Sequence, residues 1–133
     1  MNRAPGGKSG HVDGFARAHL PPRKSWPPMD YSLLPELAAY PDRMNACVEL
    51  LDKSLERLGG ERTMIRYGDL IWSYDDLKAR VDRIAATLVA DFGLVSAIIG
   101  LLRGPNNPMM AAAWLAIVKA GGVCVATMPL LRG

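Results

Sequence analysis

The loop "RGPNNP", Arg103–Pro108, has the residue types closest to a chemical motif, because a glycine-containing loop ahead of a helix is a common way to hold phosphate. A phosphate loop of this kind needs two spaced glycines and a lysine followed by serine or threonine, so that amides and an ammonium group meet the phosphate oxygens. This loop has one glycine, two prolines that remove amide donors, and no following lysine. The GxGxxG dinucleotide fingerprint is also absent. The sequence therefore disfavours phosphate binding here.

The histidines and acidic residues are weaker candidates for a metal or catalytic site. His11 and His19 lie eight positions apart with Asp13 nearby, but no further ligands at a metal-site spacing accompany them. Asp75 and Asp76 stand at a predicted helix N-terminus, where the helix dipole alone accounts for acidic residues. We therefore predict no catalytic, cofactor-binding or metal-binding residue.

Composition limits the class of protein. The chain has 133 residues, of which 50% are hydrophobic and 22% are charged, as in one modest globular domain. The net charge of +3 comes without a block of five or more basic residues, which argues against nucleic-acid binding. Cys47 and Cys124 have neither a CxxC spacing nor a disulfide framework around them, and the N-terminus lacks the apolar run of a signal peptide. These features predict a cytoplasmic protein with two buried, reduced thiols.

Three parts of the chain differ in character. Residues 1–10 have the composition of a disordered N-terminus. Residues 11–43 contain six prolines and several large apolar side chains, which favours a Pro-rich wrapping arm with one short helix near residues 12–18. Residues 44–133 contain periodic patterns, and we predict that they form an incomplete α/β subdomain.

The first regular elements are a helix and a hairpin. Asp42 is placed to cap the helix, and Gly59 with Gly60 ends it. Its apolar positions at helical spacing are Met44, Cys47, Val48, Leu51, Leu55 and Leu58. The next stretch, "TMIRYGDLIWSY", has two β-rich runs separated by Gly68 and Asp69, which predicts a β-hairpin with a type II′ turn.

A second amphipathic helix follows the hairpin directly. Ser73 and Asp76 have the spacing of a capping box, which accounts for the serine without a nucleophilic role. The predicted core-facing stripe comprises Leu77, Val81, Ile84, Ala85, Leu88, Val89 and Phe92. The predicted solvent face comprises Asp75, Lys78, Arg80, Asp82 and Arg83.

The last part of the sequence predicts a βαβ unit. Val95–Leu102 and the run "GVCVATMP" are strand-like, and between them Asn107 and Pro108 begin a helix that Gly121 ends. The two strands of such a unit are parallel neighbours joined by a right-handed crossover.

A membrane span over Met109–Met128 is the alternative for this apolar stretch. Gly121 and Gly122 divide the run into a helix of about a dozen residues and a strand, whereas spanning takes about 20 continuously helical residues. A helix that is apolar on all sides is also expected when it is buried between a sheet and another layer. The pattern therefore favours the buried helix.

Four blocks of this sequence together carry a family resemblance. They are "HVDGFARAHLPPRKSWP", "LPELAAYPDRMNACVELLD", "LIWSYDDLKARVDRIAATLV" and "LLRGPNNPMMAAAWLAIVKAGGVCVATMPLLR". They resemble the N-terminal region of the adenylate-forming, AMP-dependent acyl-CoA ligases, and they are most similar to the 2-aminobenzoate-CoA and benzoate-CoA ligases. The resemblance implies an α/β fold, a partial N-terminal domain of the ligase fold.

The resemblance also implies a reaction and its cofactors. An aryl carboxylate would attack ATP to give an acyl adenylate and pyrophosphate, and the thiol of CoA would then displace AMP, with Mg²⁺ neutralising phosphate charge. The family's Ser/Thr/Gly-rich phosphate loop, its adenylate-binding motifs and its C-terminal lysine belong downstream of this region. Because the serines and threonines here are never clustered, we expect no cofactor and no catalysis for this chain alone.

One local departure from the family and two functions stay open. Where the family has a polar turn, this chain has "LVSAIIG", Leu94–Gly100, so either the loop is rebuilt or the gene is no longer selected for the activity. The first function is an inactive N-terminal ligase fragment whose partner is the remainder of the ligase chain. The second is a non-enzymatic α/β interaction module that self-associates or pairs with a complementary fragment. Neither involves nucleic acid or a membrane.

Overall fold

The structure is a computed structural model that describes residues 18–28, 34–41 and 43–129. The chain divides into two compact units, Met1–Met44 and Asn45–Gly133, which are described separately. The expected disordered end at residues 1–10 and all but the last residue of the helix expected near residues 12–18 lie outside the described residues.

The first unit contains only short helices where it is described. They are η1 (Arg23–Ser25) and α2 (Pro35–Ala38), the latter with its proline in the first turn. The indole of Trp26 donates a hydrogen bond to the carbonyl of Pro21 at 2.8 Å. Because proline removes amide donors, short helices are what this composition permits.

The second unit opens on a helix whose predicted start is wrong. Asn45 caps it, since its Oδ1 accepts from the amides of Cys47 at 3.0 Å and Val48 at 3.3 Å. Met44, expected inside the helix, precedes it and is 50% exposed, and the expected cap Asp42 lies outside the described residues. A π-helical turn, η2 (Val48–Asp52), leads into α3 (Lys53–Leu58), and Gly59 ends the helix as predicted.

The hairpin and the helix after it are confirmed. Strands β1 (Thr63–Tyr67) and β2 (Leu70–Ser73) pair antiparallel around Gly68, which has a φ of +56°. Positive φ at the first central residue alone defines the predicted II′ turn, and Gly68 supplies it without steric cost. Helix α4 (Tyr74–Ala90) then begins with a complete capping box.

The apolar stripe of α4 is shorter than predicted. Leu77, Val81 and Ala85 are buried, but Val89 is 50% exposed and Phe92 is 76% exposed. Because α4 ends at Ala90, helical spacing no longer places Phe92 above the stripe.

The βαβ unit forms with a later start than predicted. Strands β3 (Ile99–Arg103) and β4 (Val123–Thr127) pair in parallel, in register from Ile99 opposite Val123 to Arg103 opposite Thr127, and α5 (Pro108–Lys119) connects them. The first strand begins at Ile99 and not at Val95, because a turn forms first in which the amide of Ile98 donates to the carbonyl of Val95 at 3.2 Å.

The end of α5 explains why a second strand follows it at once. Gly121 has a φ of +86°, its amide donates to Val118 at 3.0 Å, and the amide of Gly122 donates to Ile117 at 2.9 Å. These two bonds form a Schellman motif, which reverses the chain toward the sheet. Among the helices that the structure describes, none combines the length and apolar character needed to cross a bilayer.

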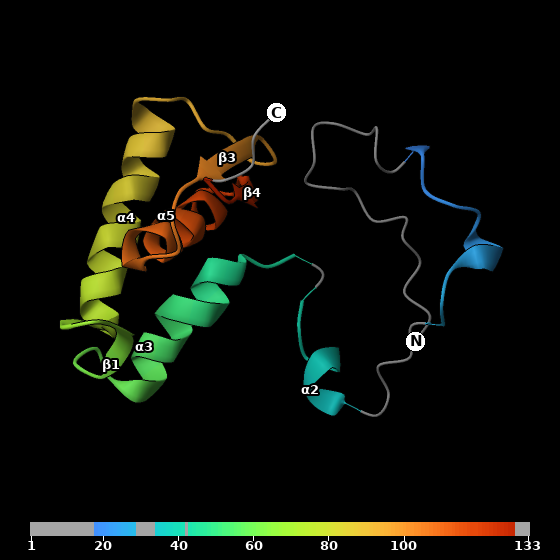
Figure 1. Cartoon of the computed structure of the whole chain (residues 1–133). Helices are drawn as coiled ribbons and strands as arrows, with labels where there is room; N and C mark the ends of the chain where they lie inside the picture. The colour runs from blue at the N-terminus through green and yellow to red at the C-terminus, as the bar shows by residue number, and fades with distance from the viewer. Residues whose placement is uncertain (1–17, 29–33, 42, 130–133) are drawn as a thin grey trace. The chain divides into compact units, whose positions relative to one another are not determined.

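The core of the second unit lies between α5, α4 and the segment that begins at Asn45. Figure 1 shows α5 between α4 and the β3–β4 pair, in agreement with its contacts to all three. Small residues of α5, Ala112 and Ala116, are fully buried together with Leu51, Leu77 and Val81. Alanines at such a crossing let two helices approach closely, and burial of the leucines and valine supplies the hydrophobic stabilisation.

Candidate functional site

The loop Arg103–Pro108 serves the fold in this structure. The side chain of Asn107 accepts from the amide of Met110 at 2.9 Å and so caps α5 as predicted. Arg103 donates from Nη2 to the carbonyl of Pro129 at 2.8 Å. These contacts engage the Asn107 side chain in helix capping and the Arg103 guanidinium with the chain after β4.

The capping box also accounts for the acidic residues at the start of α4. The hydroxyl of Ser73 accepts from the amide of Asp76 at 3.1 Å, and the carboxylate of Asp76 accepts from the amide of Ser73 at 3.1 Å. The bond from the Ser73 amide is the main reason that the pKa of Asp76 lies below its ordinary value. The amide of Asp75 donates to the carbonyl of Gly60 at 2.9 Å.

The histidine hypothesis finds no support in the part of the chain that can be examined. His19 is exposed, and His11 and Asp13 lie outside the described residues. In residues 18–28, 34–41 and 43–129, no group of three or more histidine, cysteine, aspartate or glutamate side chains could hold a metal ion.

Four charged residues form a cluster that the sequence did not reveal. The charge cluster consists of Asp52 from η2, Lys78 and Asp82 from α4, and Lys119 from α5. Lys119 Nζ lies 2.9 Å from the carboxylate of Asp52 and 2.5 Å from that of Asp82. Lys78 lies 3.7 Å from Asp52 and forms an ion pair with Asp82 one turn along α4. Opposite charges therefore tie together three helical segments that are distant in sequence.

The charge cluster shifts the titration of two of its members. Burial acts to raise the pKa of Asp82, but hydrogen bonds and charge from Lys119 and Lys78 outweigh it and hold the pKa below its ordinary value. Burial acts to lower the pKa of Lys119, but Asp82 and Asp52 together raise it. Both residues are thus held in their charged forms.

Asn45 joins two helix ends beside this cluster. While its Oδ1 caps the first helix, its Nδ2 donates to the carbonyls of Val118 at 3.1 Å and Lys119 at 3.0 Å. These carbonyls belong to the last turn of α5, whose carbonyls lack partners within the helix. One side chain therefore satisfies the start of one helix and the end of another.

The two cysteines differ in burial, contrary to the expectation that both are buried. Cys47 is fully buried, and burial raises its pKa to about 11, an effect that the charge of Lys119 opposes in part. Cys124 on β4 is half-buried, and burial also raises its pKa. Both thiols are free, as predicted.

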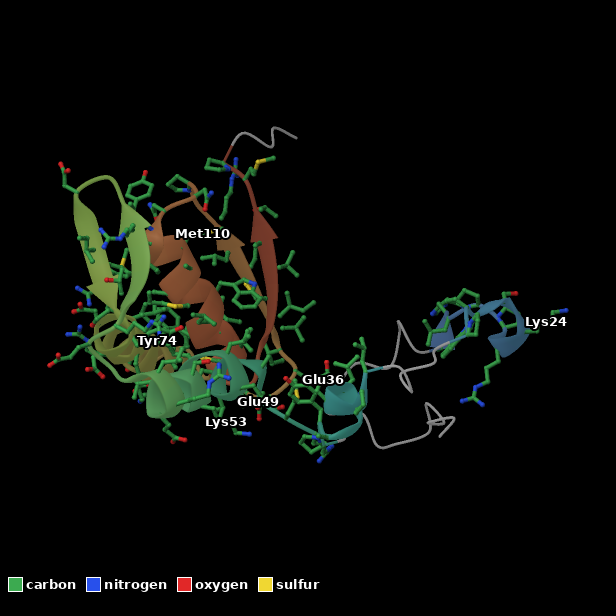
Figure 2. The ribbon with its side chains drawn as sticks, turned by 90° about the horizontal axis from the view of Figure 1, so that it is seen from below. Lys24, Glu36, Glu49, Lys53, Tyr74 and Met110 are labelled. Carbon is green, nitrogen blue, oxygen red and sulfur yellow. The ribbon has the colours of Figure 1, made fainter. Side chains whose placement is uncertain are left out.

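An apolar groove runs along α5 at the β4 side of the sheet. Its first part has a volume of about 320 Å³ and is lined by Asn106, Met110, Ala111, Trp114, Leu115 and Ala126. A second hollow of about 260 Å³ shares Asn106, Met110 and Ala126 and continues to the end of β4. The two together are called the β4 groove. Met110, labelled in Figure 2, lies where they meet.

The described fold defines an α/β protein built on a parallel βαβ crossover, with its groove beside a strand edge. A profile of the AMP-binding enzyme family matches residues 51–133. The chain belongs to this family. No curated protein matches the chain.

Solved structures of adenylate-forming ligases have the same local fold. A single-substitution variant of E. coli MenE with bound OSB-AMS is 30% identical, with a TM-score of 0.54 over 61% of this chain and 18% of its own length. ATP-bound MatB from Rhodopseudomonas palustris is 27% identical, with a TM-score of 0.59 over 66% and 17%. Klebsiella oxytoca NpsA in complex with 3-hydroxyanthranilyl-AMSN is 19% identical, with a TM-score of 0.60 over 67% and 18%. This chain thus matches less than a fifth of each of these proteins.

Sequence reasoning missed the features that depend on distant contacts. Lys78 and Asp82 were assigned to the solvent face of α4, whereas Asp82 pairs with Lys119 from α5 and Lys78 lies 3.7 Å from Asp52 of η2. Arg80 was assigned there too, but its guanidinium lies 4.2 Å from the ring centre of Trp72, in a cation–π contact. The i, i+4 spacing of Lys78 and Asp82 was the one local signal for the cluster.

Proposed function

We propose that this chain forms the N-terminal part of an ATP-dependent ligase that joins an aromatic carboxylic acid, 2-aminobenzoate or benzoate, to CoA. The family match over residues 51–133 supports the ligase assignment. The aromatic substrate rests on the four collinear sequence blocks that resemble the 2-aminobenzoate-CoA and benzoate-CoA ligases. The same proposal places the protein in the cytoplasm.

We further propose that the chain contributes scaffold and not chemistry. Two observations on the described residues support this proposal: no group of three or more His, Cys, Asp or Glu side chains could hold Mg²⁺, and Asn107 in the loop before α5 caps its own helix. No reaction step is therefore assigned to these residues. Binding of the nucleotide, the metal and CoA belongs to the parts of a ligase that this chain does not match.

An activity assay tests the scaffold role. The purified chain is incubated with ATP, Mg²⁺, CoA and either 2-aminobenzoate or benzoate, and AMP and thioester are measured. We expect neither product. Turnover that rises with chain concentration and survives repeated purification would contradict the proposal.

A second assay tests the aromatic substrate. The longest reading frame that contains this sequence is expressed and compared on benzoate, 2-aminobenzoate and acetate by pyrophosphate release. We expect kcat/KM to be highest for an aromatic acid. A preference for acetate would overturn the substrate assignment while leaving the ligase assignment in place.

A non-enzymatic interaction module is the second candidate function, and one observation favours it. Ile99, Leu101 and Val125 on the strand pair are 64%, 69% and 40% exposed. An apolar surface of this kind is typical of a protein contact. Sedimentation of the chain over a range of concentrations tests it, and a monomer at every concentration would count against self-association.

A further inference from the structure

The β1–β2 hairpin packs one face on the core and leaves the other exposed. Ile65 and Trp72 are a cross-strand pair, of which Trp72 is buried and Ile65 packs against the buried core. Because side chains alternate along a strand, the next pair, Arg66 and Ile71, projects from the opposite face. Ile71 is 51% exposed, so this outer face of the hairpin is open in the described part of the chain.

Further apolar side chains of the hairpin are exposed beside this pair. Met64, Tyr67 and Leu70 are 40%, 55% and 43% exposed. Single apolar residues are normal on a surface, but several large ones on one short hairpin form a patch. Aromatic residues, methionine and arginine are also the types enriched where proteins meet. The hairpin patch is defined as Met64, Arg66, Tyr67, Leu70 and Ile71.

The hairpin also carries one charge of each sign. Arg66 and Asp69 are the charged residues of the stretch Thr63–Ser73. Neither has an ion-pair partner among the residues that the structure describes, in contrast to the members of the charge cluster. A surface with an unpaired cation and an unpaired anion becomes complementary to itself when a two-fold axis exchanges the two positions. An anionic membrane or a nucleic acid would satisfy only the cation.

We propose that two copies of this chain associate through their hairpin patches about a two-fold axis, with Arg66 of each copy against Asp69 of the other. In such an interface each contact occurs twice, and the apolar members of the patch are buried between the two charge pairs. The inference is independent of the ligase proposal, because it involves neither nucleotide nor substrate. It also differs from self-association through the strand pair β3–β4, since it uses other elements.

The size of the hairpin sets the expected affinity. Its strands have only five and four residues. The contact is therefore smaller than the about 800 Å² per partner that a standard stable interface buries, and the dimer should dissociate at micromolar concentrations.

Charge reversal tests this pairing in solution. The mass of the chain is measured by sedimentation from about 1 µM to about 1 mM. Arg66→Asp sets carboxylates against each other across the axis, and Asp69→Arg sets cations against each other, so each variant should bind itself at least about tenfold more weakly. An equimolar mixture of the two variants should recover the wild-type affinity, because each charge then meets its opposite in the other copy.

Matched controls separate the hairpin patch from the rest of the surface. Asp91→Arg makes the same change of charge at the opposite end of α4 from the hairpin (Figure 1) and should leave the association unchanged. Ile71→Ser removes an apolar side chain from the patch and should weaken the association about tenfold. Leu101→Ser on β3, where the leucine is 69% exposed, should not. Thermal unfolding of each variant checks that these substitutions of exposed residues leave the fold intact.

Four results would overturn the inference. They are a monomer at every concentration, an Arg66→Asp variant that associates as well as the wild type, a mixture of the two charge variants that stays monomeric, and an association that Leu101→Ser abolishes. The same series is measured in the longest reading frame that contains this sequence. Recovery of association by the mixed variants supports the inference there too, and an association without charge dependence contradicts it. Because the readout is association and not ligase activity, the two proposals can fail separately.

Discussion

The two sides of α5 differ in how completely they are covered. Toward α4, Leu77 and Val81 are fully buried, and the charge cluster satisfies its own members. At the strand pair, Ile99 and Leu101 are mostly exposed. Buried packing is therefore concentrated on the helical side of α5, whereas the strand side leaves apolar side chains exposed.

Truncating one leucine on each side gives the largest expected difference. Leu77→Ala should lower the free energy of unfolding by about 3 kcal/mol, because it leaves a cavity in a packed core. Leu101→Ala should change it by less than about 0.5 kcal/mol, since little buried area is lost. Urea unfolding followed by circular dichroism measures both. Equal losses in the two variants would show that the helical side contributes no more to stability than the strand side.

Removing the central lysine of the charge cluster should have the next largest effect. Lys119→Met leaves the carboxylates of Asp52 and Asp82 without their shared partner and should cost about 2 kcal/mol. The matched control is Lys53→Met in α3, whose side chain is 58% exposed and pairs with Glu49 one turn earlier in η2 (Figure 2). That change should stay within about 0.5 kcal/mol. Similar losses in both variants would show that the cluster adds nothing beyond surface pairing.

The lowered pKa of Asp82 predicts that the free energy of unfolding falls at acid pH. Its folded pKa lies below the ordinary 3.8, so its stabilising effect is present above pH 3.8 and is lost as pH falls through the lower folded value. Asp82→Asn should flatten that part of the stability profile, measured as unfolding midpoint against pH. An unchanged acid limb in the variant would contradict the assignment.

The raised pKa of Cys47 predicts a loss of stability at the alkaline end of the same pH profile. Because burial raises its pKa from 9.0 to about 11, its effect is fully present below pH 9.0 and is lost as pH rises toward 11. Cys47→Ala should therefore flatten the alkaline limb, and Cys124→Ala serves as the half-buried control in the same unfolding experiment.

Substitutions of Asn45 test whether the hydrogen bonds that join two helix ends contribute to the stability of the helical side. Asn45→Ala removes the cap and both donated bonds and should cost about 1–2 kcal/mol. Asn45→Asp keeps the acceptor but places a carboxylate against the carbonyls of Val118 and Lys119, where the helix dipole disfavours negative charge. It should be about as destabilising as alanine. A neutral Asn45→Asp would show that the bonds to α5 contribute nothing.

The parts of the fold that could be predicted from the sequence are those governed by local chemistry. The box at Ser73 and Asp76, the turn at Gly68 and the caps Asn107 and Gly121 each need only neighbouring residues, and all were found. The predicted helix start was wrong where two residues of similar capping ability lie close together, and Asp42 was predicted as the cap in place of Asn45.

The candidate site was less predictable because it depends on tertiary contacts. The charge cluster joins residues as far apart as Asp52 and Lys119, and nothing local distinguishes Lys119 from an ordinary cation at a helix end. The exposed edge of β4 could not be predicted either, since its apolar residues are typical of a buried strand. Periodicity identifies a strand, but it does not show which neighbours the strand lacks.

The smallest expected effect lies in the turn that departs from the family. Ala97 has a φ of +72°, and its amide donates to the carbonyl of Gly121 at 2.9 Å, so a turn is rebuilt with an apolar residue in the left-handed region. A non-glycine residue in this region costs about 1–2 kcal/mol, and glycine removes that cost. Part of the improvement is lost because glycine gives the unfolded chain more conformational freedom. Ala97→Gly should therefore raise the free energy of unfolding by about 0.5–1 kcal/mol, measured by urea unfolding. The control is Ser96→Gly, because Ser96 itself has no positive φ, and this variant should lose stability. Loss of stability in Ala97→Gly would mean that the backbone at Ala97 is not strained.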